Sequence, residues 1–186
     1  HLLRRQRQMC IRDSNCTDCI ATRIPIDQFS PTRRQKRIIN KNRDLQCIEV
    51  DSIDSEEHYT LYERYITLRH GDGDMYPPSR TQYLQFIGAP SAFSRFIEFR
   101  LNGVLLAVSV FDEFDDNLSA IYSFFEPESN RSLGVYIVLW LIELARAESH
   151  YFVYLGYWIK DCQKMAYKIE YRPIQLRING RWQTLN

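Results

Sequence analysis

The sequence predicts an α+β fold in which helices flank a mixed β-sheet, and three observations support this prediction. Apolar residues recur with helical spacing at 54–69, and an almost uniformly apolar run at 132–148 is interpreted as a second helix, with a segment of strand character between them. Asn-Gly pairs at 102–103 and 179–180 join extended runs, which is the strongest short signal of a β-hairpin. A chain of 186 residues, 45% of them hydrophobic, can bury the core of one ordinary domain or two small ones.

Helices dominate the expected structure of the first half. The run SPTRRQKRIINKNRDL begins with a Ser or Thr that can cap a helix, and cations are spread over its turns. The segment 54–69 has acids in its first turn and Arg69 in its last, as the helix dipole prefers. Glycines and prolines at 71–78 then break the chain. The expected elements are a helix at 30–45, a strand at 45–50, a helix at 54–69 and a shorter helix at 79–87.

Extended runs fill the middle of the chain, and helices and strands alternate after it. The expected elements are strands at 96–101, 104–111 and 118–125, a helix at 132–148, a strand at 151–159, a helix at 161–169 and a hairpin over 174–185. An antiparallel meander that leads into a strand–helix–strand crossover is the element order of the GNAT fold of many N-acetyltransferases. The likeness is an analogy, because a fold alone names no reaction.

The charge of the chain is nearly balanced but unevenly distributed. The net charge is +1, yet residues 1–43 carry eleven Arg and Lys against three Asp, a basic end that could meet phosphate. Glu143 and Arg146 interrupt the most apolar run, so no membrane span is expected. The amino end has no apolar signal-peptide core, and five cysteines do not suggest a secreted disulfide framework. These features together favour a cytoplasmic protein.

Three regions are expected along the chain. Residues 1–14 show neither helical nor strand periodicity, and we interpret them as a non-native or remnant segment, with the complete chain extending further upstream. Residues 15–50 form a region of cysteines and basic residues that we interpret as what is left of an N-terminal domain. Residues 51–186 form the acyltransferase-like catalytic domain.

The start of the helix at 132–148 is a candidate binding site. Asn130 and Ser132 are good cap residues, and the free N–H groups of a first helical turn bind anions. Ser132, Leu133 and Gly134 would form this site, with Gly134 admitting a ligand close to the backbone. The alternative is that Gly134 allows the helix to pack closely on the sheet. Tyr136 occupies a place where acetyl-coenzyme A enzymes of this fold have a small residue, which argues against a pyrophosphate cradle.

Several ordered segments resemble the arginyl/leucyl-tRNA–protein transferase family, most closely its bacterial aspartate/glutamate leucyltransferases. The resemblance covers about residues 16–182 and is carried by CTDCIATRIPI, SPTRRQKR, NRDL, LYERYITLRHGDGDMYPP, LSAIYSFFEPESNRSLGVY, YLGYWI and MAYK. It implies an enzyme that moves leucine from leucyl-tRNA to the α-amine of proteins that begin with Asp or Glu, marking them for degradation. Eukaryotic relatives transfer arginine, and no single residue decides between the two donors.

The implied reaction is aminolysis of an ester, which needs positioning and stabilised charge rather than a nucleophilic side chain. Glu126, which follows the strand at 118–125, is the candidate general base, with a solvated turn acid as the alternative. Tyr122 and Tyr157 can offer hydroxyl groups as hydrogen-bond donors or leaving-group acids, or can be core residues. Gly156 lies in mid-strand, where a bulge could open a slot for the aminoacyl end next to Gly134.

Cations are the expected readers of an acidic N-terminal residue and of RNA. Arg69, His70 and Lys168 are the candidates for binding the acidic residue, and solvated surface charge is the alternative. Four cations of the first helix are the candidates for the tRNA backbone: Arg33, Arg34, Lys36 and Arg37. A plain solvated helix is the alternative.

Cys16 and Cys19 form a CxxC pair, which is half of a four-ligand metal site. The pair could bind zinc or an iron–sulfur cluster, or remain two free thiols, and no cofactor is required for the transfer itself. Two rival functions stay open, an acyl-coenzyme A N-acetyltransferase and a non-catalytic module that binds tRNA or protein N-termini.

Overall fold

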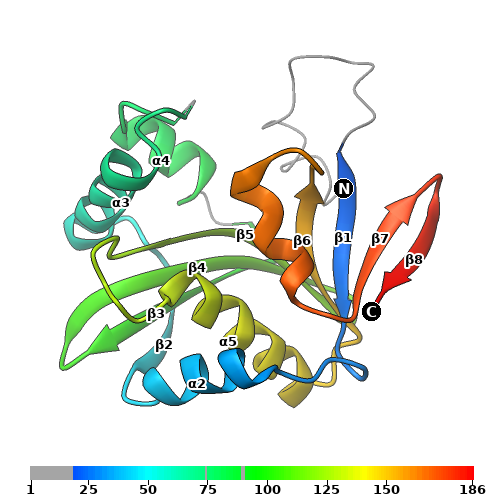
Figure 1. Cartoon of the computed structure of the whole chain (residues 1–186). Helices are drawn as coiled ribbons and strands as arrows, with labels where there is room; N and C mark the ends of the chain where they lie inside the picture. The colour runs from blue at the N-terminus through cyan, green and yellow to red at the C-terminus, as the bar shows by residue number, and fades with distance from the viewer. Residues whose placement is uncertain (1–18, 74, 89–90) are drawn as a thin grey trace. The chain divides into compact units, whose positions relative to one another are not determined.

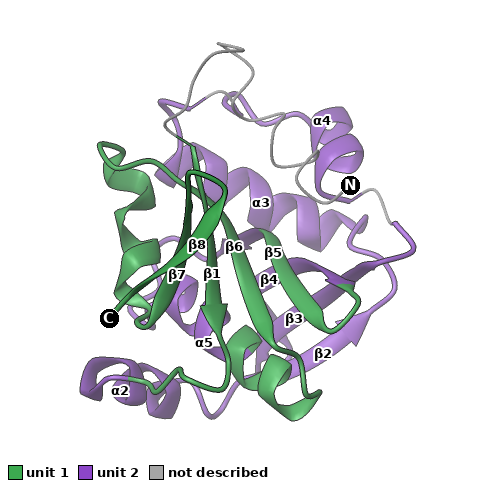
Figure 2. Cartoon of the chain, turned by 90° about the vertical axis from the view of Figure 1, so that its right-hand side faces the viewer, with its two compact units in different colours: residues 1–31, 114–121, 141–186 green, residues 32–113, 122–140 purple. Residues whose placement is uncertain are grey.

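The computed structural model describes residues 19–73, 75–88 and 91–186, whose element order is traced in Figure 1. The chain forms two compact units from interleaved segments, shown in different colours in Figure 2. Unit 1 combines residues 1–31, 114–121 and 141–186, and unit 2 combines residues 32–113 and 122–140. Residues 15–50 therefore contribute to both units.

Unit 2 carries the helical half of the chain and an antiparallel ladder. Strand β3 pairs antiparallel with both β2 and β4, and the β3–β4 turn is the predicted Asn102-Gly103 pair, with both residues at positive φ. Its elements are α2 (Arg33–Lys41), β2 (Gln46–Val50), α3 (Glu56–Arg69), α4 (Arg80–Phe86), β3 (Ser94–Leu101), most of β4 (Val104–Phe114), the end of β5 (Asn117–Phe125) and the first half of α5 (Leu133–Ala147).

Side-chain caps determine where the helices of unit 2 begin. Thr32 and Gln35 form a reciprocal capping box at α2, in which each side chain accepts from the other residue's backbone N–H. Ser55 caps α3 and Ser79 caps α4 in the same way, through the N–H three residues on. These caps place the helix starts one to three residues after the predicted ones, because the cap residue itself is not helical.

Aromatic rings fill much of the core of unit 2. The ring of Tyr62 lies 4.8 Å from that of Tyr83 and 5.8 Å from that of Phe124, and all three side chains are fully buried. The Tyr83 hydroxyl donates to the carbonyl of Ile53, so burial of that polar group is compensated. This cluster packs α3, α4 and the end of β5 together.

A buried polar chain links α3 to β3. His58 contacts Ser55 Oγ through Nδ1 at 2.6 Å and Glu98 Oε1 through Nε2 at 2.7 Å, and Arg100 Nε donates to the other oxygen of Glu98 at 2.6 Å. Burial disfavours the charge on Glu98, but the hydrogen bonds from Arg100 and His58 outweigh it and hold the pKa of Glu98 below its ordinary value. Glu98 is therefore a charged carboxylate in a buried place.

Unit 1 is built around a sheet whose central strand the sequence analysis did not predict. β1 (Ile20–Pro25) pairs antiparallel with β6 (Phe152–Trp158) on one side and with β7 (Ile174–Ile178) on the other, and β7 pairs with β8 (Arg181–Leu185). The first residues of β5 pair in parallel with β6, so the sheet has both parallel and antiparallel pairs and is mixed, as predicted. β1 was missed because its partners lie more than 120 residues further along the chain.

The α+β, GNAT-like class is confirmed, and most predicted elements lie within three residues of their expected positions. One helix differs in kind: the segment expected to be helical at 161–169 is the 3₁₀ helix η2 (Gln163–Glu170). In the part of the chain that is described, no helix combines the length and apolarity that a membrane crossing requires.

Candidate functional site

Phe125, the last residue of β5, is the centre of a side-chain cluster in unit 2. The centroid of the Phe125 ring lies 4.8 Å from that of Tyr65 on α3, and Arg69 Cζ lies 5.7 Å from the centroid of the Phe125 ring. A Cβ atom built on Gly134 would lie 3.0 Å from Phe125 Cε1 and 3.1 Å from Cζ. The cluster thus joins the end of α3 to the first turn of α5.

Gly134 is explained by this contact. The ring edge of Phe125 occupies the space that a side chain at Gly134 would need, so the glycine lets the ring reach the helix backbone. Of the two interpretations of Gly134, close packing on β5 is the one for which the structure provides a contact. The neighbouring Leu133 is buried, whereas Ser132 is exposed and has a positive φ of 55°.

The predicted cations Arg69 and His70 lie together at the carboxyl end of α3. His70 caps the helix through its backbone N–H to the Ile66 carbonyl, and its ring lies 5.0 Å from that of Tyr65. The side chain of Arg69 is exposed and reaches over Phe125. The structure therefore brings three predicted site residues, Arg69, His70 and Gly134, to one aromatic cluster.

Glu126, the predicted base, is engaged in an ion pair. Arg64 donates to both carboxylate oxygens of Glu126, at 2.9 and 3.3 Å, and also reaches Glu128 at 3.1 Å. The hydrogen bonds from Arg64 hold the pKa of Glu126 below its ordinary value. A carboxylate with a lowered pKa is a weaker base, and this favours a role for Glu126 in orienting Arg64.

The hydroxyl of Tyr122 lies on β5, in the same unit. It donates to Met75 Sδ at 3.5 Å, a weak acceptor in the loop after α3. Burial raises the pKa of Tyr122 well above that of a free tyrosine, so the hydroxyl stays protonated at neutral pH. Tyr122 is therefore suited to donate a hydrogen bond and is unsuited to act as a base.

The segment before α5 is tied to α2. Lys41 Nζ donates to the Asn130 carbonyl at 2.6 Å, and Asn42 Nδ2 donates to the Arg131 carbonyl at 2.9 Å. Arg131 makes a two-pronged ion pair with Asp44, at 2.7 and 2.9 Å, which lowers the pKa of that carboxyl. Because Arg131 is occupied in this way, the RSLG run is used to fasten α2 and α5 together.

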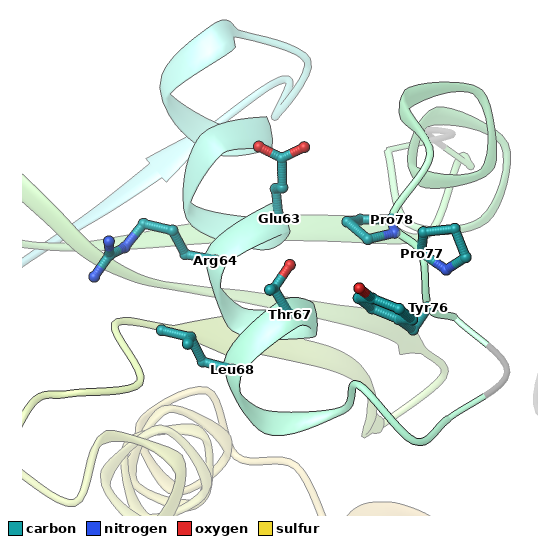
Figure 3. Close-up of a pocket in the computed structure, with 7 residues that line it drawn as sticks. All are labelled: Glu63, Arg64, Thr67, Leu68, Tyr76, Pro77 and Pro78. Carbon is teal, nitrogen blue, oxygen red and sulfur yellow. The ribbon is translucent and has the colours of Figure 1, made fainter.

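A shallow pocket of about 480 Å³ runs along the exposed side of α3. Figure 3 shows Glu63 and Thr67 of α3 opposite the loop residues that close its other side. Leu68 is 56% exposed and Tyr76 is 48% exposed, so the lining of the pocket is partly apolar. The residues that line it are Glu63, Arg64, Thr67, Leu68, Tyr76, Pro77 and Pro78.

Unit 1 holds the second predicted feature, a kink in β6. Gly156 has a φ of 78°, and the pairing of β1 with β6 shifts register between Thr22 and Arg23, which confirms the predicted bulge. Side chains hold the two carbonyls at the kink: Thr22 Oγ1 donates to Gly156 O at 3.0 Å, and Lys168 Nζ donates to Tyr157 O at 2.6 Å. Lys168 is thus a buried side chain that fastens η2 to β6.

Comparison with known proteins identifies the family. Residues 57–178 match the model described as "Arginine-tRNA-protein transferase, C terminus". The chain belongs to this family. It is 56% identical over 173 residues to an aspartate/glutamate leucyltransferase of Pseudomonas fluorescens (strain Pf0-1), covering 92% of this chain and 74% of that protein. The protein of the same name from Pseudomonas aeruginosa (strain LESB58) is 52% identical over 172 residues, covering 92% and 73%.

Solved structures share the fold of this family member at low sequence identity. L-PGS from Bacillus licheniformis superposes with a TM-score of 0.62 at 10% identity, over 89% of this chain and 58% of that one. FemX superposes with a TM-score of 0.55 at 10% identity, over 82% of this chain and 57% of that one. The chain therefore spans less than two thirds of these structures, and the likeness concerns the fold.

The remaining predicted residues lie outside the Phe125 cluster. The four cations of α2, Arg33, Arg34, Lys36 and Arg37, are all exposed, and α2 precedes the segment matched by the family model. Tyr157 and Gly156 belong to unit 1, whereas Gly134 belongs to unit 2, so the predicted joint slot stays a prediction. Cys16 lies outside the described residues, and Cys19 is half-buried just before β1. The CxxC metal site is accordingly also still a prediction.

The sequence analysis missed Tyr65, Phe125 and Arg64. These residue types are ordinary for an amphipathic helix and a strand end. Only the packing of α3 against the end of β5 brings Tyr65 to Phe125 and Arg64 to Glu126. One signal was available: Phe125, Glu126 and Gly134 lie within ten residues in a segment that carried the family resemblance.

Proposed function

We propose that this chain moves leucine from leucyl-tRNA to the α-amine of proteins that begin with Asp or Glu. The observation that carries the proposal is the 56% identity, over 92% of the chain, to a protein named for this activity. The partners are then an aminoacyl-tRNA donor and an acceptor protein, and the reaction takes place in the cytoplasm, where both occur.

The chemistry is attack of the acceptor amine on the carbonyl carbon of the aminoacyl ester. A new C–N bond forms, a tetrahedral intermediate follows, and its collapse breaks the C–O bond to the tRNA ribose. The proton lost by the amine balances the proton gained by the ribose oxygen. Because the pKa of an α-amine is about 7.7–8.0, a fair fraction is already neutral and needs little base catalysis.

The residues of the Phe125 cluster support this chemistry in unit 2. Arg69 would bind the acidic side chain of the acceptor with two parallel hydrogen bonds, with His70 beside it. The protonated hydroxyl of Tyr122 would donate to the developing negative charge or to the leaving oxygen. The pocket along α3, whose lining includes Leu68, the residue before Arg69 in the sequence, would take the acceptor residues that follow the first. Lys168, whose ammonium lies in unit 1, would act on the β6 backbone rather than on the acceptor.

The four exposed cations of α2 would bind tRNA phosphates. If they do, replacing Arg33, Arg34, Lys36 and Arg37 together by Gln makes the plot of log affinity against log salt shallower, by roughly 0.7–0.9 for each phosphate that is no longer neutralised. The buried residues of α2, Gln35 and Ile38, are untouched by this change, so the fold is expected to persist. An unchanged slope would remove α2 from the tRNA interface.

The function is tested by incubating the protein with labelled leucyl-tRNA or arginyl-tRNA and peptides that begin with Asp, Glu or Ala. Transfer of leucine to Asp and Glu peptides, and not to Ala, is the expected result. Transfer of arginine instead would change the donor. Acetylation of the peptides from acetyl-coenzyme A, or tRNA binding without any transfer, would overturn the proposal in favour of the two rival functions.

A further inference from the structure

One face of the sheet in unit 1 carries a cluster of aromatic rings around an arginine. The guanidinium of Arg23 lies between two rings, with Cζ 3.6 Å from the centroid of Phe152 and 4.1 Å from that of Trp182. Tyr154 continues the cluster, 6.0 Å from Trp182 and 5.7 Å from Phe114. The aromatic face is defined as Arg23, Phe114, Phe152, Tyr154, Arg177 and Trp182.

Hydrogen bonds hold the arginine of the aromatic face in place. Arg23 Nε donates to Gln175 Oε1 at 2.7 Å, and Arg23 Nη1 donates to the Tyr154 hydroxyl at 3.1 Å. The guanidinium is therefore positioned by β6 and β7 from both sides of β1. A stack of ring, guanidinium and ring fixed in this way is preorganised, so binding a flat ligand against it costs little ordering.

Among the described residues of unit 1, the aromatic face is the more exposed side of these strands. Its rings are half-buried, whereas the residues that alternate with them, such as Ile24, Val153 and Ile174, are completely buried on the opposite side. In Figure 2 no helix from the described part of unit 1 is drawn in front of β1, β6, β7 and β8. Half-exposed aromatic rings on an open sheet face are the arrangement that stacks on unpaired bases in sheet-based RNA-binding modules.

The charge of the face suits a polyanion. The strands IATRIP, FVYLGYW, IQLRI and RWQTL contain no acidic residue and three arginines, of which Arg23 and Arg177 belong to the aromatic face, whereas Arg181 alternates with Trp182 and lies on the opposite side. Arg177 lies directly across from Trp182 in the β7–β8 ladder and is exposed, with no hydrogen-bond or ion-pair partner among the described residues. A free arginine next to a stacking ring can bind the phosphate that follows a stacked base.

We propose that the aromatic face binds unpaired nucleotides of the donor tRNA, with bases that stack on the rings and a backbone phosphate that binds Arg177. That the RNA is a tRNA rests on the proposed function; that the ligand is single-stranded RNA rests on the rings and the charge. A protein partner would also contact aromatic residues and arginine. RNA is favoured because the four strands offer positive charge alone.

The test follows binding of an unstructured RNA oligonucleotide and of deacylated tRNA to the whole chain, by fluorescence anisotropy of labelled RNA. Trp182→Ala is expected to weaken the affinity for the oligonucleotide and for the tRNA at least tenfold, because stacking contributes about 1–3 kcal/mol per base. Trp182→Phe keeps a ring and is expected to bind within about threefold of the original chain. Phe93→Ala removes an exposed ring (61%) that is not part of these strands and is the matched control.

Trp182→Phe also guards against loss of folding as the cause of weak binding. If Trp182→Ala binds RNA as tightly as the original chain, the aromatic face is not an RNA site, and a protein partner becomes the better explanation. If Phe93→Ala weakens binding as much, the effect is not specific and the proposal likewise fails.

Leucine transfer separates this proposal from the proposed function. A raised KM for leucyl-tRNA with little change in kcat in Trp182→Ala supports both. The chain could bind RNA through its rings and yet transfer no leucine to any peptide. That result would support the aromatic face as an RNA site and overturn the proposed function. If Trp182→Ala transfers leucine with an unchanged KM for leucyl-tRNA, the proposed function stands and the aromatic face is not a tRNA site.

Discussion

Single residues at the Phe125 cluster have functions that follow from what each side chain touches. Gly134 leaves room for a ring, Arg69 extends over that ring, and Glu126 is held by Arg64. The sequence analysis singled out Gly134, Arg69 and Glu126, but it did not assign these contacts. The partners of Arg69 and Glu126 lie on elements distant in sequence, and Gly134 meets Phe125 only through the packing of α5 on β5. Two predictions belong to this scale.

Replacing Gly134 by Ala is expected to destabilise the protein by about 1 kcal/mol. Displacing the Phe125 ring costs about 1–3 kcal/mol, which the better helix propensity of Ala partly offsets. Urea unfolding measures the change. In a Phe125→Leu background the shorter side chain leaves space, so the same replacement should be neutral or stabilising. A chain that tolerates Gly134→Ala equally well with Phe125 present would contradict the packing explanation.

Replacing Arg69 by Met is expected to raise the KM for peptides that begin with Asp by about 10- to 100-fold. The reason is that hydrogen bonds to a charged group contribute about 1.5–3 kcal/mol. Arg69→Lys keeps the charge without the planar fork and should give an intermediate KM. The KM for leucyl-tRNA is the internal control. An equal rise in both KM values would show that Arg69 does not read the acidic residue.

At the scale of elements, the kink in β6 depends on a neighbouring helix. Lys168 of η2 is buried and donates to the carbonyl next to Gly156, so this 3₁₀ helix acts as a clamp on the strand. The glycine signal for a bulge was local and was read correctly from the sequence. The clamp was not predicted, because Lys168 was expected to bind the acidic substrate.

Replacing Lys168 by Met should lower the free energy of unfolding by about 1–3 kcal/mol, since the half-buried Tyr157 carbonyl loses a charged donor. If the kink positions residues for transfer, kcat should fall while both KM values change little. Lys160→Met, at an exposed lysine just before η2, is the control and should leave stability and kcat unchanged. A selective rise in the KM for acidic peptides would restore the original substrate-binding role.

At the scale of the whole molecule, the buried Glu98 network makes stability depend on pH. Because the folded pKa of Glu98 is lowered, its contribution is fully present above its ordinary pKa of 4.5 and is lost as the pH falls through the folded value. Glu98→Gln removes the charged acceptor of Arg100 Nε and the carboxylate that contacts His58, while Arg100 keeps its ion pair with Glu57. We therefore expect a loss of about 1.5–3 kcal/mol at pH 7.

Urea unfolding from pH 7 to pH 3 measures that loss directly. The difference between the original chain and Glu98→Gln should shrink as the pH falls below 4.5. Glu63→Gln, at an exposed carboxylate of the same unit, is the control and should show a small difference at every pH. A constant difference across the range would mean that the charge of Glu98 is not what stabilises the network.

The sequence by itself determined the features that short-range chemistry controls. Caps at Thr32, Ser55 and Ser79, the two Asn-Gly turns and the glycine bulge in β6 each depend on residues within a few positions, so their signals are local. The family could also be recognised, because many short ordered motifs together are specific even when each is weak.

Only the tertiary structure decided which of those residues meet. β1 became a central strand through pairs with β6 more than 120 residues away, and the sequence around it gave no periodic signal. Phe125, Arg64 and Lys168 also acquired partners on other elements, Arg64 across 62 residues and the other two across shorter separations that turn between a strand and a helix. Contacts between distant segments depend on how whole elements pack, which the pattern of nearby residues does not encode.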